Sequence, residues 1–340
     1  MPKHNRSCST KKIQKDLCNT VNTTDSYLNQ TFWQQFMPLV NPLALLRHAR
    51  AHQYAIGAFN VNNLETIQSV IGAAEHCNTP VILQTSQGAI NYAGIEQLYC
   101  MIATAAAHSP IPVTLHLDHG TDLAIIKQAI KIGYTSVMID VSAYTYQKNI
   151  QLTKQVVTWA HKKKVCVEAE LGTLGGNEDL IHGKIQYTDP ELAKDFAEQT
   201  GCDTLAVAIG TSHGAHKLQG EPHINLTLLA QIAKKVSIPL VLHGASMLSS
   251  KSTNRAKKAG VKLSHTKGIP LQDIKQAITY GIAKINTDTD LRIAFDTGVR
   301  EFMKYHAADI DARHVLSNAR TVMQKTIQEH IKIFGTQRTR

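Results

Sequence analysis

Eight short segments of β-branched and apolar residues recur along the chain, and this repetition constrains the fold more than any other feature. They are YAIGAFNV (54–61), PVILQTS (80–86), PVTLHLD (112–118), SVMID (136–140), VCVEAELG (165–172), TLAVAIG (204–210), PLVLHG (239–244) and IAKINTD (282–288). Segments of this length and composition are typical of β-strands. We therefore expect eight strands.

Helical patterns lie between successive strands, with apolar residues spaced three and four apart. Examples are LETIQSVIGAAEHC (64–77), DLAIIKQAIKIG (122–133) and NLTLLAQIAKKV (225–236). Strict alternation of strand and helix predicts parallel pairing through right-handed crossovers. A single α/β (β/α)8 TIM barrel over residues 37–335, with a C-terminal helical extension, accounts for the 340 residues without a second domain.

A doubly wound sheet would use the same strand and helix units. Such a fold normally places a G-x-G-x-x-G phosphate-binding turn after its first strand. Here the first strand runs into NVNNLET, which favours the barrel.

Residues 1–36 differ in composition from the rest of the chain. They are rich in Ser, Thr and Asn, have only Asp16 and Asp25 as acids, and lack the apolar stretch of a secretory signal. We expect a disordered N-terminal tail. Met37 begins MPLVNPLALL, so translation from this internal methionine is an alternative.

The composition indicates a globular protein of a reducing compartment. No apolar run reaches the roughly 20 residues that a membrane span needs. No C-x-x-C pair occurs among the six cysteines, which are Cys8, Cys18, Cys77, Cys100, Cys166 and Cys202. We expect a soluble cytoplasmic protein without a disulfide framework or a thiolate zinc site.

The net charge of +10 is compatible with a polyanionic partner, a phosphorylated substrate or a basic surface. Basic residues concentrate only in residues 251–268. No aromatic residues are interleaved there for base stacking, which favours a solvated helix face over a nucleic-acid site.

Acids and histidines follow the predicted strands at their carboxyl ends, where barrels of this kind have their active sites. They are Asp118, His119, Asp140, Glu168, Glu170, His213, His243, Asp288 and Asp290, and the amide residue Asn286 ends the eighth strand beside them. One such histidine alone is more often a hydrogen-bonded structural residue. Three imidazoles from separate strands beside a carboxylate instead match a catalytic divalent-metal site, and zinc suits nitrogen ligands best. His116 lies deeper on its strand and is interpreted as structural.

Two glycine-rich loops offer backbone N–H groups that could hold a phosphate, GTSHGAHK (210–217) and HGAS (243–246). Lys217 and Arg292 could supply positive charge. Glycine is also common in such loops for steric reasons alone, so this signal is not specific by itself.

The motifs LDHG, MID, VEAELG, AIGTSHG, LVLHGAS and KINTDTDLR, in this order, resemble those of the class II, metal-dependent fructose-bisphosphate aldolases. The resemblance covers residues 37–335. It implies a catalytic Zn²⁺ bound by His119, His213 and His243, with Glu170 and Asp140 at a second or alternate metal position. It also implies that Asp118 exchanges a proton with the hydroxyl at carbon 4, and that Glu178 on a mobile loop moves the proton of the dihydroxyacetone phosphate carbon.

The same resemblance implies the substrate contacts. The residues for the ketose phosphate, with a monovalent cation such as Na⁺ nearby, are Gly214, Lys217, Gly244, Ala245 and Ser246. Those for the other end of the sugar are Asn286, Asp288, Thr289 and Arg292. The expected partners are thus a small sugar bisphosphate and a second copy of the chain, in a homodimer or larger assembly, with neither nucleic acid nor membrane.

The activity implied is reversible cleavage of fructose 1,6-bisphosphate to dihydroxyacetone phosphate and glyceraldehyde 3-phosphate. A metal would stabilise the enediolate left by carbon–carbon cleavage; the alternative, a Schiff-base lysine, lacks a lysine at the strand ends. Asp288 and Arg292 favour the fructose sugar over tagatose bisphosphate, whose aldolases typically have a small residue and Lys there. A non-catalytic sugar-phosphate or nucleic-acid-binding protein remains the alternative class, although each catalytic position is filled. A second activity outside the cytoplasm is left open.

Overall fold

The structure is a computed structural model that describes residues 39–173, 175–178, 181–183, 186–213, 224–263 and 268–336. The chain divides into two units, Met1–Phe36 and Met37–Arg340. The first unit lies outside the described residues, and so does the tail predicted for residues 1–36.

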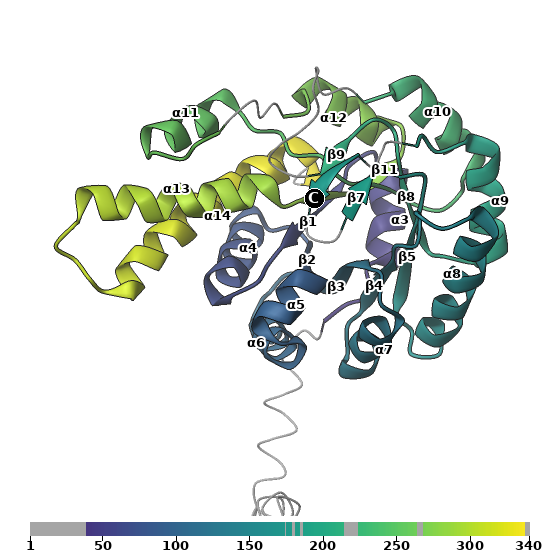
Figure 1. Ribbon diagram of the computed structural model, residues 1–340, viewed down its shortest axis with the longest axis horizontal. Coiled ribbons are helices and arrows are strands. Elements are labelled where there is room, and N and C mark those ends of the chain that lie inside the picture. The colour runs from purple at the N-terminus through teal and green to yellow at the C-terminus, as the bar shows by residue number, and fades with distance from the viewer. Residues whose placement is uncertain are drawn as a thin grey trace, which may run out of the picture. The chain divides into compact units, whose positions relative to one another are not determined.

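Eight parallel strands close into a barrel in the order β1-β11-β10-β8-β5-β4-β3-β2 (Figure 1). Their bounds are β1 (Ile56–Asn60), β2 (Val81–Ser86), β3 (Val113–Gly120), β4 (Ser136–Ile139), β5 (Cys166–Leu171), β8 (Thr204–Val207), β10 (Leu240–Leu242) and β11 (Ile282–Thr287). Each predicted strand segment overlaps one of them. The predicted TIM barrel is confirmed.

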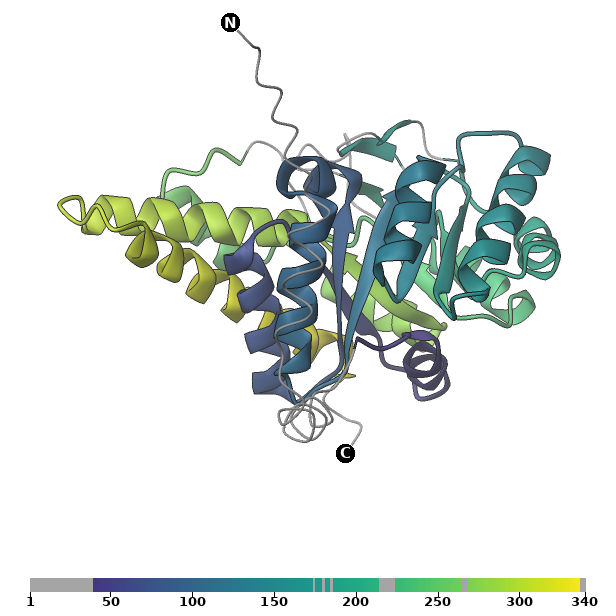
Figure 2. The same ribbon diagram turned by 90° about the horizontal axis from the view of Figure 1, so that it is seen from below.

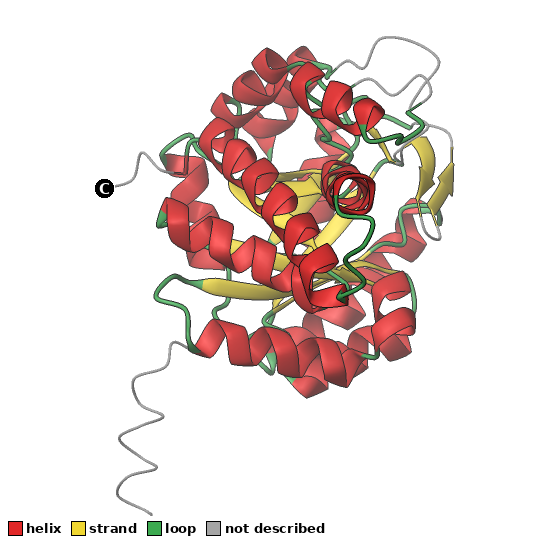
Figure 3. Cartoon of the chain, turned by 90° about the vertical axis from the view of Figure 1, so that its left-hand side faces the viewer, coloured by secondary structure: helices red, strands yellow, loops and turns green. Residues whose placement is uncertain are grey.

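Helices surround the barrel on its outside, as Figure 3 shows with the yellow strands enclosed by red helices. They are α4 (Leu64–Cys77), α5 (Gln87–Ala93), α6 (Ile95–Ala107), α7 (Leu123–Ile132), α8 (Tyr146–His161), α9 (Pro190–Thr200), α10 (Leu226–Lys235), α11 (Ser250–Lys258) and α12 (Leu271–Thr279). Short polar side chains start several of them; Asp122 caps α7 and Asp189 caps α9 by accepting backbone N–H bonds. The apolar helix faces and the outward strand residues form one continuous core. None of the described helices has both the length and the apolar character needed to cross a membrane.

The inside of the barrel is apolar at its amino-terminal end. Ile56, Ile82 and Ala283 pack there against Leu46 and Ala49 of α3 (Leu43–Ala51). In Figure 2, α3 lies at the end of the barrel opposite the short strands of the loop region. The amino-terminal end of the barrel is therefore closed by apolar side chains, and the polar side chains lie toward its carboxyl end.

A small sheet, β7-β6-β9, joins two loops at the carboxyl end. It contains β6 (Gly175–Glu178), β7 (Ile181–Gly183) and β9 (Ser212–His213). Gly176 of β6 pairs with His213 of β9, so the backbones of the segments carrying Glu178 and His213 lie in one sheet. The side chains of these two residues lie outside what the structure describes.

The predicted C-terminal helical extension is confirmed as a hairpin of α13 (Thr289–Tyr305) and α14 (Ala312–Phe334), which projects sideways from the barrel (Figure 1). The two helices cross closely, because a Cβ added to Gly298 would lie 2.5 Å from Ala319 Cα. The end of α14 returns to the barrel, where the Phe334 carbonyl accepts from the Ala55 amide.

Candidate active site and metal centre

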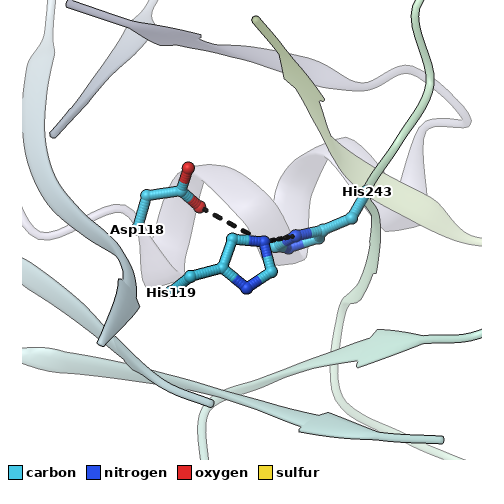
Figure 4. A group of neighbouring side chains, drawn as sticks. All are labelled: Asp118, His119 and His243. Atoms are coloured by element: carbon cyan, nitrogen blue, oxygen red, sulfur yellow. Dashed lines mark hydrogen bonds and ion pairs between the residues drawn. The ribbon is translucent and has the colours of Figure 1, made fainter. Parts of the chain in front are cut away.

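Asp118 and His119 are consecutive on β3, yet both side chains face the centre of the barrel mouth (Figure 4). Regular strand alternation would direct one of them outward. The φ angle of His119 is +44°, in the left-handed region, and the pairing of β3 with β4 shifts between Leu117 and Gly120. Gly120 permits this bend, because a Cβ there would lie 2.5 Å from the Met138 carbonyl oxygen. The local break in the strand therefore brings an acid and an imidazole into one site.

His119 is oriented by Asp140 at the end of β4. Its Nδ1 lies 2.7 Å from Asp140 Oδ2, and Asp140 Oδ1 accepts a 2.8 Å hydrogen bond from Ser142 Oγ. An ionised carboxylate can only accept, so Nδ1 of His119 carries a proton. Nε2 then faces His243, while Glu170 Oε2 stands 3.9 Å from Nδ1.

His243, just after β10, is oriented in the same way by a different acid. Its Nε2 lies 2.8 Å from Glu168 Oε1, and Glu168 Oε2 accepts a 2.8 Å bond from Lys284 Nζ. The imidazole proton facing Glu168 is therefore on Nε2. Nδ1 of His243 consequently directs its lone pair toward His119.

The two imidazoles converge on one point. His243 Nδ1 and His119 Nε2 are 2.8 Å apart, the rings meet edge to face at 83°, and Asp118 Oδ1 lies 4.0 Å from His119 Nε2 (Figure 4). Both outer ring nitrogens already donate to carboxylates, so two lone pairs would face each other unless a proton or a cation lies between them. Two imidazole nitrogens that converge in this way, with the Asp118 carboxylate beside them, fit a divalent metal of the kind that prefers nitrogen ligands.

A second group of ligand atoms shares His119 and contains Asp140 and Glu170. Glu170 is 3% exposed, and its Oε2 has no hydrogen-bond partner within the described part of the chain. Burial, together with the charge of Asp140, raises the pKa of Glu170 well above its ordinary value. A cation at this group would satisfy the buried oxygen.

The electrostatics of His119 reflect the surrounding acids. Burial acts to lower the pKa of His119, but Asp118, Asp140 and Glu170 outweigh it and raise the pKa to about 10. Burial likewise acts to raise the pKa of Asp140, yet the hydrogen bond and charge of His119 hold it below its usual range. In the absence of a cation, the acids around His119 therefore favour its protonated form.

Asp118 is held by three side-chain amides. Its Oδ2 accepts from Asn60 Nδ2 at 2.9 Å and Gln84 Nε2 at 3.2 Å, and its Oδ1 accepts from Asn286 Nδ2 at 3.1 Å. Burial acts to raise the pKa of Asp118, but His119 and other nearby positive groups and the Asn60 bond lower it overall. The site therefore presents an ionised carboxylate that can accept a proton.

A cavity of about 540 Å³ opens beside this cluster between β1, β2 and α13. Asn60 lines it as well as contacting Asp118, and Asp288 and Arg292 lie on its wall. Arg292 makes a 2.7 Å ion pair with Asp288 and is half exposed. Asn60 is thus the residue that links the wall of this cavity to the Asp118 carboxylate.

The loop after β10 is held by Asp290, which accepts from the backbone N–H groups of Met247 and Leu248. Gly244 in this loop has a φ of +62°, and Ala245 and Ser246 are buried. Gly214 and Lys217 of the other predicted phosphate loop lie outside the described residues.

Comparison with known proteins identifies the family to which the chain belongs. The model of the family described as fructose-bisphosphate aldolase class-II matches residues 40–339. The chain belongs to this family. The fructose-bisphosphate aldolase of Thermus caldophilus is 46% identical over 301 residues, which span 88% of this chain and 98% of that protein. The one of Giardia intestinalis is 42% identical over 303 residues, 88% of this chain and 94% of that protein.

A solved structure agrees with this assignment to the class-II aldolases. The YdjI aldolase of Escherichia coli K12 superimposes with a TM-score of 0.71 at 34% identity, covering 88% of this chain and 98% of that one. The family resemblance predicted from the motifs is confirmed. Membership implies a divalent metal and a sugar bisphosphate substrate.

Sequence reasoning missed three contributors to the site of this class-II aldolase. Asn60 and Gln84 bind the Asp118 carboxylate, and Lys284 binds Glu168 inside the barrel. Each is a polar residue within a strongly apolar strand segment, and that is the signal that could have found them. The roles predicted for the individual site residues stay predictions, although Asp118, His119, His243, Asp140 and Glu170 do lie together.

Proposed function

We propose that the protein catalyses the reversible aldol cleavage of fructose 1,6-bisphosphate to dihydroxyacetone phosphate and glyceraldehyde 3-phosphate. The observation that carries the proposal is the convergence of His119 Nε2 and His243 Nδ1 beside the Asp118 carboxylate. Membership of the class-II aldolases supports it.

His119 and His243, together with His213 from β9, would hold a catalytic Zn²⁺. Nitrogen-rich ligand sets favour zinc among the divalent metals available to proteins. Bound there, the metal would act as a Lewis acid that stabilises negative charge developing on the ketone oxygen of the substrate. Glu170 and Asp140 would serve the second or alternate metal position.

Asp118 is the proton-transfer group of this mechanism. Its ionised carboxylate would accept the proton of the hydroxyl at carbon 4 as the bond between carbons 3 and 4 breaks and the aldehyde forms. In the condensation direction it would return that proton. The amides of Asn60, Gln84 and Asn286 hold both oxygens in place, and burial keeps water from competing. Glu178, on the loop after β5, would move the proton of the dihydroxyacetone phosphate carbon.

The two phosphates would be bound on different sides of the site. Gly214, Lys217, Gly244, Ala245 and Ser246 would hold the ketose phosphate, with Na⁺ nearby. The other end of the sugar would contact Asn286, Asp288, Thr289 and Arg292. Asp288 and Arg292, which form a 2.7 Å ion pair, resemble the fructose branch of the family and favour fructose over tagatose bisphosphate.

We further propose a cytoplasmic homodimer or larger homo-oligomer. The catalytic barrel would span residues 37–335, and residues 1–36 would form a disordered tail. The cysteines that the structure describes are free thiols, which supports a reducing compartment.

The test is cleavage of fructose and tagatose 1,6-bisphosphates by the purified protein, before and after chelation and again after zinc is restored. We expect cleavage that favours fructose, disappears with the chelator and returns with zinc. A preference for tagatose would overturn the substrate assignment alone. Chelator-resistant cleavage, or no cleavage with zinc bound, would overturn the metal mechanism.

A further inference from the structure

A chain of polar side chains lies inside the barrel beneath the site, where the interior is otherwise closed to water. Lys284, Glu168 and His116 are each 1% exposed and come from β11, β5 and β3. Ser136 of β4 and His243 complete the chain at its two ends. Burying charged groups costs free energy, which pairing and hydrogen bonding only offset. We therefore ask which function this buried chain of polar residues serves.

The hydrogen bonds in this chain have one consistent direction. A lysine ammonium can only donate, and Lys284 Nζ lies 2.8 Å from Glu168 Oε2 and 3.2 Å from His116 Nε2. His116 must therefore accept at Nε2, carry its proton on Nδ1 and donate to Ser136 Oγ at 2.7 Å. The remaining oxygen of Glu168, Oε1, is left to accept the Nε2–H of His243 at 2.8 Å.

This direction determines which nitrogen of His243 can bind a metal. With the proton on Nε2, the lone pair of Nδ1 points at the convergence with His119 Nε2. In the opposite tautomer, a lone pair on Nε2 would face the Glu168 carboxylate, and an N–H on Nδ1 would block the metal position. Carboxylates that receive the second N–H of a metal-binding histidine set its tautomer and ring orientation in other metal sites.

We propose that Glu168, held in place by Lys284, is a positioning residue that fixes His243 in the tautomer with its Nδ1 lone pair directed into the metal site. This inference rests on the proposed metal centre. Lys284 occupies one carboxylate oxygen and thereby directs the other to His243. Its own position is fixed by His116, so the whole chain supports a single ring nitrogen at the mouth of the barrel.

Three variants separate hydrogen bonding from mere packing. Glu168→Gln has one amide oxygen, for which Lys284 and His243 must compete, so we expect weaker zinc binding. Adding Lys284→Met removes the competing donor and returns the oxygen to His243, so we expect the double variant to regain most of the affinity. Glu168→Leu with Lys284→Met keeps an uncharged, filled interior but has no acceptor, and we expect it to lose about 10- to 100-fold in zinc affinity.

The primary measurement is the zinc dissociation constant of the full chain, by competition with a chromophoric chelator at one pH. The second is the ¹⁵N spectrum of the histidine rings in metal-free protein, with the His243 signals assigned from their absence in His243→Gln. We expect the Nε2–H tautomer in the wild type and in Glu168→Gln/Lys284→Met, and a mixture of tautomers in Glu168→Leu/Lys284→Met.

Equal zinc affinity and equal ring spectra in the two double variants would overturn the inference, because a packing role does not require an acceptor. If Glu168→Leu/Lys284→Met does not fold, the rescue of Glu168→Gln by Lys284→Met decides: a second substitution that weakens zinc binding further overturns the proposal. These results are independent of turnover. A wild type that binds zinc but does not cleave the sugar would refute the proposed function and leave the positioning role standing.

Discussion

Replacement of Asp118 by Asn is the sharpest test of the mechanism, because the structure predicts a large fall in kcat and only a small change in the free energy of unfolding. An amide cannot accept the proton of the carbon 4 hydroxyl. Loss of a positioned general base lowers turnover by about 100- to 10,000-fold. We expect kcat for fructose 1,6-bisphosphate cleavage to fall within this range.

The structural cost of Asp118→Asn follows from its three amide partners. The new side chain would keep its oxygen toward Asn60 and Gln84, which both donate to Oδ2, and its NH2 group would replace the oxygen that accepts from Asn286. Asn286 Oδ1 is buried and has no partner among the described residues, so rotation of that amide can supply an acceptor. We expect the free energy of unfolding to change by no more than about 1 kcal/mol.

The assay couples glyceraldehyde 3-phosphate release to a dehydrogenase, with thermal unfolding measured on the same samples. Asn60→Ala is the matched control, since it removes one of the donors to Asp118 while leaving the carboxylate intact, and it should retain far more activity. The mechanism is refuted if Asp118→Asn folds normally, binds metal and keeps more than about a tenth of the wild-type kcat.

Other predictions concern protonation and backbone geometry. Because its pKa is raised to about 10, His119 stabilises the metal-free protein fully below about pH 6.5, and this stabilisation is lost as the pH rises through 10. Zinc must displace the His119 proton, so chelator competition should show zinc affinity rising about tenfold per pH unit. A flat profile of zinc affinity against pH would contradict this. Burial lowers the pKa of His330, although the charge of Asp290 opposes this, so the contribution of His330 to stability is present above about pH 6.5 and is lost as the pH falls. Urea unfolding should therefore show that the stability of His330→Phe is less sensitive to acid than that of the wild type. An unchanged dependence of stability on pH would contradict this. Gly120→Ala places a Cβ 2.5 Å from the Met138 carbonyl oxygen and should destabilise the protein by about 1–3 kcal/mol and reduce the amount of bound metal. Calorimetry and metal analysis test these two effects. Wild-type stability and wild-type metal content in this variant would show that the bend tolerates a side chain.

The barrel could be predicted because its signals are local. Each strand is a short run of apolar residues, and each helix shows its apolar face within one or two turns of chain. The site region was also predictable, since parallel strands that end in Asp118, Asp140 and His243 must bring those ends to one mouth. The family assignment followed from the same short motifs and is confirmed.

The break in β3 could not be predicted from the pattern. Alternation along VTLHLDHG predicts that Asp118 and His119 point in opposite directions, and only the positive φ of His119 turns both toward the metal position. Gly120 makes the bend possible, because a Cβ at this position would lie 2.5 Å from the Met138 carbonyl oxygen of the neighbouring strand. No local preference of these residues indicates it.

By itself, the sequence determined the alternation of strands and helices, and with it which residues stand at the carboxyl ends of the strands. The tertiary structure decided which atom of each residue faces the reaction. Glu168 orients His243 across 75 residues of chain, and Lys284 binds Glu168 across 116. Hydrogen-bond direction depends on the full set of neighbours that a closed barrel brings together. The lone pairs of the two histidines therefore converge at the metal position only when all eight strands are paired.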